Sequence, residues 1–286
     1  MVDRLLLPEQ RELLTPGTIM RIAYHPLKSG RRQFLQSTIL TPKGILHDRE
    51  IMAVDQNGIM YTQREDPKLA LIATDIDDNS IRMEANGQSV TVPLLRNGVE
   101  IGATVHSTKG LLSVDQGDEL ADLVSHIIGK RARVVRMKDD FVRKVKPEYM
   151  VHRDDISNQL GFADGGQLLL TASDSADQVN NWIQEDTPNY PPVPIDNYRG
   201  NIEINSFGFP FAEDKIAIAQ AGNVQFVFPW LCARCVETTN DQLSGIPNPT
   251  VADFLANPNN KAKQPLYSLT KHRMGEYFPG KKGALF

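Results

Sequence analysis

Residues 51–62 read IMAVDQNGIMYT, two apolar runs on either side of an Asn-Gly pair. Such a pair is a strong hairpin signal, because both central residues of the tight turn need a positive φ. The pattern recurs at residues 81–92, which read IRMEANGQSVTV. Short strands repeated at this spacing predict a mainly β fold, built as a barrel or a sandwich.

The rest of the chain adds strands and a few helices to this pattern. Further apolar runs predict strands at residues 19–24, 99–105, 132–137, 168–170, 202–204 and 224–228. Apolar residues at helical spacing predict a helix at residues 118–128, whose start Asp118 can cap, and Ser173 can cap a second helix at residues 173–184. A third helix is predicted at residues 251–255. We expect a flexible tail at residues 1–17, a β-rich domain at 18–125 and a second one at 126–286.

The composition limits the classes of protein to consider. With 286 residues, 41% of them hydrophobic and 23% charged, the chain is typical of soluble globular proteins. A net charge of -4 argues against a nucleic-acid binder, since such proteins usually carry a basic excess. We find no apolar run of about 18 residues and no signal peptide, so we expect a cytoplasmic protein without a membrane span.

The two cysteines lie in residues 228–239, which read FPWLCARCVETT. A disulfide scaffold and an iron–sulfur cluster within the chain are excluded, because a cluster needs four thiolates. Half a zinc site and a CxxC redox pair are possible interpretations, but the six histidines show no ligand spacing and the flanks do not open a helix. On spacing alone, two ordinary buried cysteines are favoured.

Arg234 favours a functional role for Cys235 over that interpretation, because it stands directly before Cys235. A guanidinium beside a thiolate lowers the pKa of the thiol and offers a bidentate fork to an anion. A thiolate next to such an arginine suits a metal that is held by a phosphorylated cofactor.

The same stretch resembles the Cys-x-Arg-Cys-x-x-Thr-Thr signature of MOSC proteins related to the mitochondrial amidoxime-reducing component and its bacterial homologues. Each further motif is weak alone, but six of them occur in the family's order. They are HPLKS (25–29), GILHDR (44–49), TQREDPKLA (62–70), FADG (162–165), YRGN (198–201) and PFAED (210–214). The chain is therefore identified as similar to this family from about Ile19 to its end.

The resemblance implies a mainly β (α+β) fold, with an N-terminal MOSC-associated β-barrel domain and a C-terminal MOSC β-barrel that carries a few helices. It implies that Cys235 ligates the metal of a molybdenum cofactor (Mo-molybdopterin), as the candidate metal-binding and catalytic residue. The other implied cofactor contacts are Lys28, Ser29, Arg49, Arg199, Asn201 and Arg234. Because they come from both halves, the cofactor is expected between the domains. Pyridoxal phosphate binding is also associated with the family.

The activity implied by the resemblance is that of a molybdenum-dependent oxidoreductase that reduces small N-hydroxylated compounds. Electrons would come from a separate donor, a flavoprotein or a ferredoxin-like protein, because the sequence shows no haem motif and no flavin fingerprint. Two alternatives stay open. The chain could carry sulfur or cofactor through a persulfide on Cys235, or it could be a cofactor-binding module without turnover.

The sequence departs from the family pattern at three places. Gly200 stands where the family has a proline between the arginine and the asparagine, which we expect to loosen the turn. The early Lys-Ser pair is followed by the more basic Gly30-Arg31-Arg32. The chain stops at residues 283–286, where relatives continue from a similar Phe, so we expect a MOSC domain that is truncated at its C-terminus.

Overall fold

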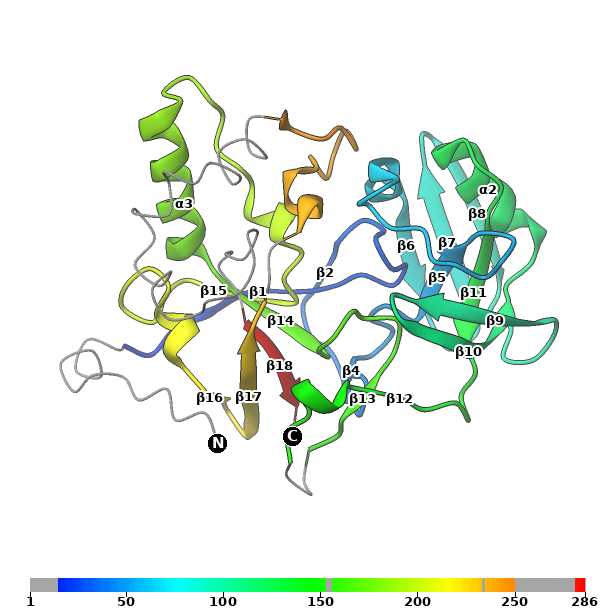
Figure 1. Cartoon of the computed structure of the whole chain (residues 1–286), viewed down its shortest axis with the longest axis horizontal. Coiled ribbons are helices and arrows are strands. Elements are labelled where there is room, and N and C mark those ends of the chain that lie inside the picture. Colours follow the sequence, from blue (N-terminus) through cyan, green and yellow to red (C-terminus); the bar gives the residue numbers. More distant parts are fainter. Residues whose placement is uncertain (1–14, 153–155, 233–234, 250–280, 286) are drawn as a thin grey trace.

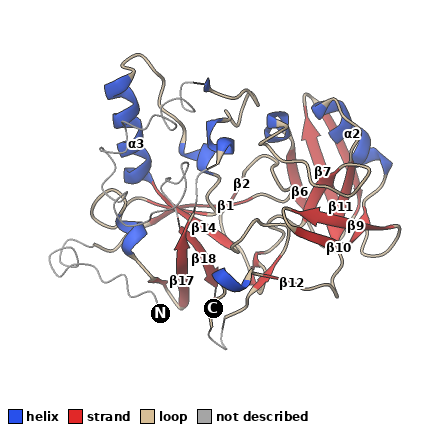
Figure 2. Ribbon diagram, in the orientation of Figure 1, coloured by secondary structure: helices blue, strands red, loops and turns tan. Residues whose placement is uncertain are grey.

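The computed structural model describes residues 15–152, 156–232, 235–249 and 281–285. Strands dominate this part of the chain, and its two α-helices are α2 (Asp118–Ile128) and α3 (Ser173–Asp186) (Figure 2). The mainly β fold class is confirmed. The helix expected at residues 251–255 and residues 1–14 of the expected tail lie outside the described residues.

The strands form two lobes that lie side by side, as Figure 1 shows. The first lobe holds the four-stranded sheet β5-β11-β10-β9 and the three-stranded sheet β6-β7-β8, with α2 packed on them. Its strands are β5 (Ile51–Val54), β6 (Ala73–Ile76), β7 (Ser80–Ala85), β8 (Gln88–Pro93), β9 (Glu100–Val105), β10 (Thr108–Asp115) and β11 (Arg133–Met137).

The two Asn-Gly pairs behave differently. Asn86 and Gly87 have φ of 51° and 76°, and they join β7 to β8 in the predicted hairpin. Residues 59–62 form no strand and pair only through isolated bridges at Ile59 and Met60. The turn itself is antiparallel, because Asp55 N donates to the Ile59 carbonyl and Tyr61 N to the Ala53 carbonyl, and Asp55 Oδ1 accepts the N–H groups of Asn57 and Ile59 within it.

Helix α2 covers the predicted residues 118–128. Its apolar face buries Leu120, Val124 and Ile127 against the sheets of the first lobe, as the helical spacing indicated. The expected cap at Asp118 is wrong, because Gly117 occupies the N-cap position and Asp118 is the first helical residue.

The second lobe is a seven-stranded sheet with the order β16-β17-β18-β14-β15-β1-β2, flanked by α3. Neighbouring strands run antiparallel, except for the parallel pair β14 and β15. The strands are β1 (Ile19–Tyr24), β2 (Gln33–Leu35), β14 (Leu168–Ala172), β15 (Ile202–Ile204), β16 (Ile218–Ala221), β17 (Val224–Leu231) and β18 (Lys281–Leu285).

Short elements complete the described part of the chain. The two-stranded pairs are β3 (Leu40–Thr41) with β4 (Gly44–Ile45), and β12 (Arg143–Lys144) with β13 (Gln159–Leu160). The 3-10 helices are η1 (Pro67–Leu71), η2 (Pro147–Tyr149), η3 (Ile195–Tyr198), η4 (Ala212–Lys215) and η5 (Val236–Thr239). No helix in the residues that the structure describes is long and apolar enough to cross a bilayer.

Each of the two predicted domains contributes strands to the sheets of both lobes. The predicted boundary at residues 125 and 126 stays a prediction. Strands β1 and β2 belong to the sheet of the second lobe, whereas β11 pairs with β5 in the first lobe. The chain therefore passes between the lobes in the segments that follow β1 and β4. These segments hold the HPLKS and GILHDR motifs, so the motifs lie where the lobes meet.

Glu213 in η4 is a buried carboxyl group beneath α3. The hydroxyl of Ser175 donates a hydrogen bond of 2.9 Å to Glu213 Oε2. Burial, followed by the neighbouring carboxylates Asp214 and Asp174, raises the pKa of Glu213 from 4.5 to about 8. Between these two pH values the folded chain binds a proton that the unfolded chain has released, so stability falls as the pH rises through this window.

We expect Glu213→Gln to flatten this pH dependence. Its amide cannot ionise, so the loss of stability with rising pH, at most about 1.4 kcal/mol per pH unit for one group, should shrink. Urea unfolding of both proteins at several values between about pH 5 and pH 8 measures the slopes. Parallel slopes in the two proteins would contradict the raised pKa of Glu213.

Candidate functional site

A pocket lies where segments from before residue 65 and after residue 162 converge. Six of the seven predicted site residues line it, namely Lys28, Ser29, Arg49, Arg199, Asn201 and Cys235. The seventh, Arg234, lies outside the described residues. The other lining residues are Arg64, Ala163, Asp164, Gly166, Leu168, Leu169, Asn197, Tyr198, Cys232, Glu237 and Thr238. The structure thus brings together positions that are far apart in the sequence, while their roles stay predictions.

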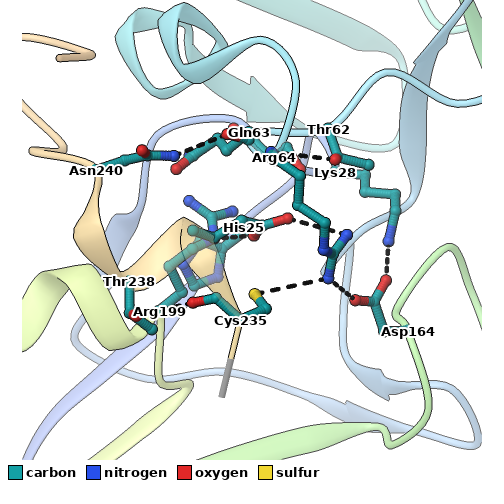
Figure 3. A network of polar contacts seen from close by, with 12 residues as sticks. His25, Lys28, Thr62, Gln63, Arg64, Asp164, Arg199, Cys235, Thr238 and Asn240 are labelled. Carbon is teal, nitrogen blue, oxygen red and sulfur yellow. Dashed lines mark hydrogen bonds and ion pairs between the residues drawn. The ribbon is translucent and has the colours of Figure 1, made fainter. Parts of the chain in front are cut away.

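Cys235 lies at the point where η5 begins, and its sulfur faces the pocket (Figure 3). Thr238 donates to the Cys235 carbonyl through both its N–H, at 3.3 Å, and its hydroxyl, at 2.9 Å. These bonds hold the backbone of Cys235 in an extended conformation just before the short helix. The position of the sulfur is therefore set by backbone contacts on its C-terminal side.

The arginine that contacts this sulfur is Arg64. Its Nη2 donates to Cys235 Sγ at 3.7 Å and to Asp164 Oδ2 at 2.9 Å, and its Nη1 lies 3.1 Å from Glu237 Oε1. Burial, followed by the Glu237 carboxylate, raises the pKa of the Cys235 thiol, and Arg64 opposes that shift only in part. The expected effect of Arg234 on this pKa lies outside the described residues, and among those described burial has the largest effect.

Lys28 reaches the same network from the segment after β1. Its Nζ donates to the Phe162 carbonyl at 2.9 Å and forms an ion pair with Asp164 (Figure 3). The side chain is almost fully buried, and burial lowers the pKa of Lys28 although Asp164 opposes the shift. Asp164 thus joins Lys28 to Arg64 across the pocket wall.

Arg49 and Asn201 form a second group in the pocket. Arg49 Nη1 donates to Asn201 Oδ1 at 2.9 Å, and its Nη2 donates to the Arg199 carbonyl at 3.3 Å. Asp48 pairs with Arg49 and accepts the N–H of His25 at 2.7 Å. Asp48 therefore orients the arginine.

Arg199 is a buried guanidinium whose own backbone is in the left-handed region, at φ 56°. Its Nη1 donates to the Gly30 carbonyl at 2.8 Å and to Gln242 Oε1 at 3.0 Å. Burial lowers the pKa of Arg199 to about 10, so the side chain stays charged at neutral pH. Its bonds join the segment after β1, which lines the pocket, to the segment after η5.

Gly200 is held in close contact between these site residues. A Cβ atom at this position would lie 2.5 Å from Thr171 Oγ1 and 2.8 Å from its Cγ2. The expectation that the glycine loosens the turn stays a prediction. Thr171 is fully buried and cannot move aside freely, so glycine lets Arg199 and Asn201 approach β14 closely.

Sequence reasoning assigned no role to Arg64, Asp164, Asn197 or Glu237. Arg64 and Asp164 stand in the TQREDPKLA and FADG motifs, which were the available signal. The pocket has two acidic side chains, Asp164 and Glu237, and four cationic ones: Lys28, Arg49, Arg64 and Arg199. The excess positive charge suits an anionic ligand.

One buried acceptor in the pocket wall has no partner among the described residues. Asn197 Nδ2 donates to the Thr238 carbonyl at 3.2 Å, but Asn197 Oδ1 is buried and accepts no hydrogen bond there. A buried amide oxygen without a donor is unfavourable, so a ligand N–H that reached it would be stabilised. The pocket therefore offers a thiol, cationic side chains and a free acceptor to one ligand.

A comparison with known families gives a match over the first part of the chain. Residues 16–131 match the family described as the MOSC N-terminal beta barrel domain. The predicted resemblance to MOSC proteins is thereby confirmed. The match covers the first lobe up to β11, together with β1 and β2 of the second lobe.

Curated relatives of the chain fall into two groups, both at low identity. The molybdenum cofactor sulfurase of Danio rerio is 26% identical over 273 residues, covering 91% of this chain and 31% of the relative. The mitochondrial amidoxime-reducing component 1 of Mus musculus is 24% identical over 272 residues, covering 93% of this chain and 74% of the relative. The chain thus spans about a third of the sulfurases. A solution structure of a Bordetella bronchiseptica protein matches 37% of the chain at 16% identity and a TM-score of 0.29.

Proposed function

We propose that this chain binds the molybdenum cofactor, with Cys235 as the thiolate ligand of the metal, and reduces N-hydroxylated compounds. The observation that carries the proposal is the convergence of Cys235 with Lys28, Arg49, Arg64 and Arg199 on one pocket. The names of the relatives, which include amidoxime-reducing components and molybdenum cofactor sulfurases, support the same chemistry.

The donor set fits this cofactor in three respects. A cysteine sulfur is a soft ligand, and soft ligands suit a metal that is also held by sulfur. The excess of cationic side chains suits the phosphate of the cofactor, for which Lys28 and the arginines are the candidates. The unpartnered Asn197 Oδ1 suits an N–H group of a pterin ring.

In the proposed reaction an N–O bond breaks, and two electrons and two protons convert the N-hydroxylated compound into the amine and water. The bound cofactor supplies the two-electron chemistry. The residues of this chain bind and orient it. Cys235 would hold the metal, Arg49 and Asn201 support each other at the wall, and Arg199 ties the segment after β1 to the segment after η5. Electrons come from a separate flavoprotein or ferredoxin-like protein in this proposal.

The sulfurase relatives favour a second candidate function, in which a persulfide on Cys235 carries sulfur to the cofactor. A cofactor-binding module without turnover is the third. Cytoplasmic location and pyridoxal phosphate binding stay predictions.

Molybdenum content and donor dependence test the favoured function. We expect the purified chain to contain molybdenum and to reduce an amidoxime with a reducing dye, but not with NADPH alone, because we find no Gly-rich nicotinamide motif in the sequence. Metal analysis and formation of the corresponding amidine are the measurements.

Each alternative has its own signature in this experiment. A cyanide-labile persulfide on Cys235 without turnover would favour the sulfur carrier. Bound molybdenum without dye-driven turnover and without a persulfide would favour the cofactor-binding module. NADPH turnover in a flavin-free preparation would contradict the need for a donor protein.

A further inference from the structure

We propose that Arg64 is a positioning residue that donates an N–H···S hydrogen bond to the metal-bound sulfur of Cys235 and raises the reduction potential of that metal. The inference rests on the proposed function. It adds a residue of the first lobe to a site whose metal ligand comes from the segment after β17.

The geometry places one guanidinium between three acceptors. The Nη2 group is shared between Cys235 Sγ, at 3.7 Å, and Asp164 Oδ2, at 2.9 Å (Figure 3). The Nη1 group lies 3.1 Å from Glu237 Oε1. A guanidinium is planar and carries five N–H donors in a fixed fork, so two carboxylates can hold it while it still faces a third group. The carboxylates therefore aim Arg64 at the sulfur.

The backbone of Arg64 is fixed as firmly as its side chain. Thr62 Oγ1 accepts the N–H of Arg64 at 3.2 Å, which makes a local turn. The adjacent Gln63 is fully buried, and its Nε2 donates to the Ser29 carbonyl at 2.8 Å. Asn240 Nδ2 donates to the Gln63 carbonyl at 2.8 Å. The loop is thus tied to two other segments, one next to Lys28 and one shortly after Cys235.

A hydrogen bond to a ligating sulfur withdraws negative charge from it and favours the more electron-rich state of the metal. Such bonds are among the factors that set the potential of metal–thiolate centres. Asp164 and Glu237 have the opposite effect, because their negative charges favour the oxidised metal. Without Arg64 the sulfur would lose its donor and both carboxylates would lose a cation. These changes act in the same direction and lower the potential.

The test compares Arg64→Met and Arg64→Lys with the wild-type chain and with Arg82→Met. Methionine keeps much of the length of the side chain and removes every donor. Lysine keeps the charge but replaces the fork with one compact group. Arg82 is an exposed arginine on β7 that pairs with Glu84, so Arg82→Met controls for the loss of a surface arginine. The measurements are molybdenum per chain and the midpoint potential of the bound metal in a spectroscopic redox titration.

We expect the midpoint potential to shift downward in Arg64→Met, to shift less in Arg64→Lys, and to stay at the wild-type value in Arg82→Met. If Arg64→Met fails to fold or to load metal, the midpoint potential of Arg64→Lys decides whether Arg64 affects the metal. Loaded variants with the wild-type potential would overturn the role of Arg64 while leaving the proposed function intact. A wild-type chain that takes up no molybdenum would overturn the proposed function itself, and this inference with it.

Discussion

Cys235→Ser is expected to remove bound molybdenum and to abolish dye-driven reduction. A serine oxygen is a harder and poorer ligand than a thiolate for a metal that is otherwise held by sulfur. The substitution keeps the size of the side chain nearly unchanged, and the two bonds from Thr238 reach the backbone carbonyl, so the local fold should persist. Metal analysis of the purified protein, with circular dichroism as a check on folding, measures the effect.

Cys232→Ser is the matched control, since Cys232 lines the same pocket three positions earlier. We expect this variant to keep its molybdenum and part of its activity, because only the second cysteine matches the ligating position of the family signature. Small and equal losses in the two variants would refute the assignment of Cys235. Loss of metal in Cys232→Ser alone would move the ligand to Cys232.

The fold could be predicted where local pattern and local chemistry agree. Strand β1 and helix α2 have the predicted ends, and the helical spacing of apolar residues in α2 matches the burial of one face. At residues 59–62 the chain turns back antiparallel on β5 as predicted, but the second strand is reduced to isolated bridges. Prediction failed for the capping of α2, where Gly117 precedes the acidic residue.

The order of strands in the second lobe could not be read from the sequence. Strand β1 pairs with β15, and the whole first lobe lies between these two strands in the sequence. No periodicity within either strand identifies its partner, since the pairing depends on which apolar faces meet after the chain has folded. The mixing of the predicted domains follows from this long-range pairing.

In the candidate site, too, the local motifs could be predicted but the contacts between distant segments could not. Motifs that resemble those of the family named six residues that line one pocket, although their roles remain to be measured. Arg64 and Asp164 stood inside quoted motifs without an assigned role. They are 100 positions apart, and nothing in either motif shows that the two side chains meet beside the sulfur of Cys235.

Arg199→Ala is expected to lower molybdenum content strongly while the chain stays folded. The variant loses a charged donor to an anionic cofactor, and a hydrogen bond to a charged group contributes about 1.5–3 kcal/mol, roughly a 10- to 100-fold change in affinity. It also frees the Gly30 carbonyl and Gln242 Oε1, which Arg199 Nη1 now holds at 2.8 Å and 3.0 Å. The segments that follow β1 and η5 should then be less well fixed to each other.

Arg199→Lys distinguishes the effect of the positive charge at this position from the effect of the guanidinium shape. A lysine keeps the positive charge but cannot reproduce the fork that reaches Gly30 and Gln242 together. We therefore expect an intermediate molybdenum content for Arg199→Lys, with Arg82→Ala at the wild-type level because Arg82 is exposed on β7. Thermal unfolding of each metal-free protein shows whether a loss of metal reflects the pocket or the whole fold. Wild-type molybdenum content in Arg199→Ala would mean that the cofactor, if bound, lies elsewhere in the molecule.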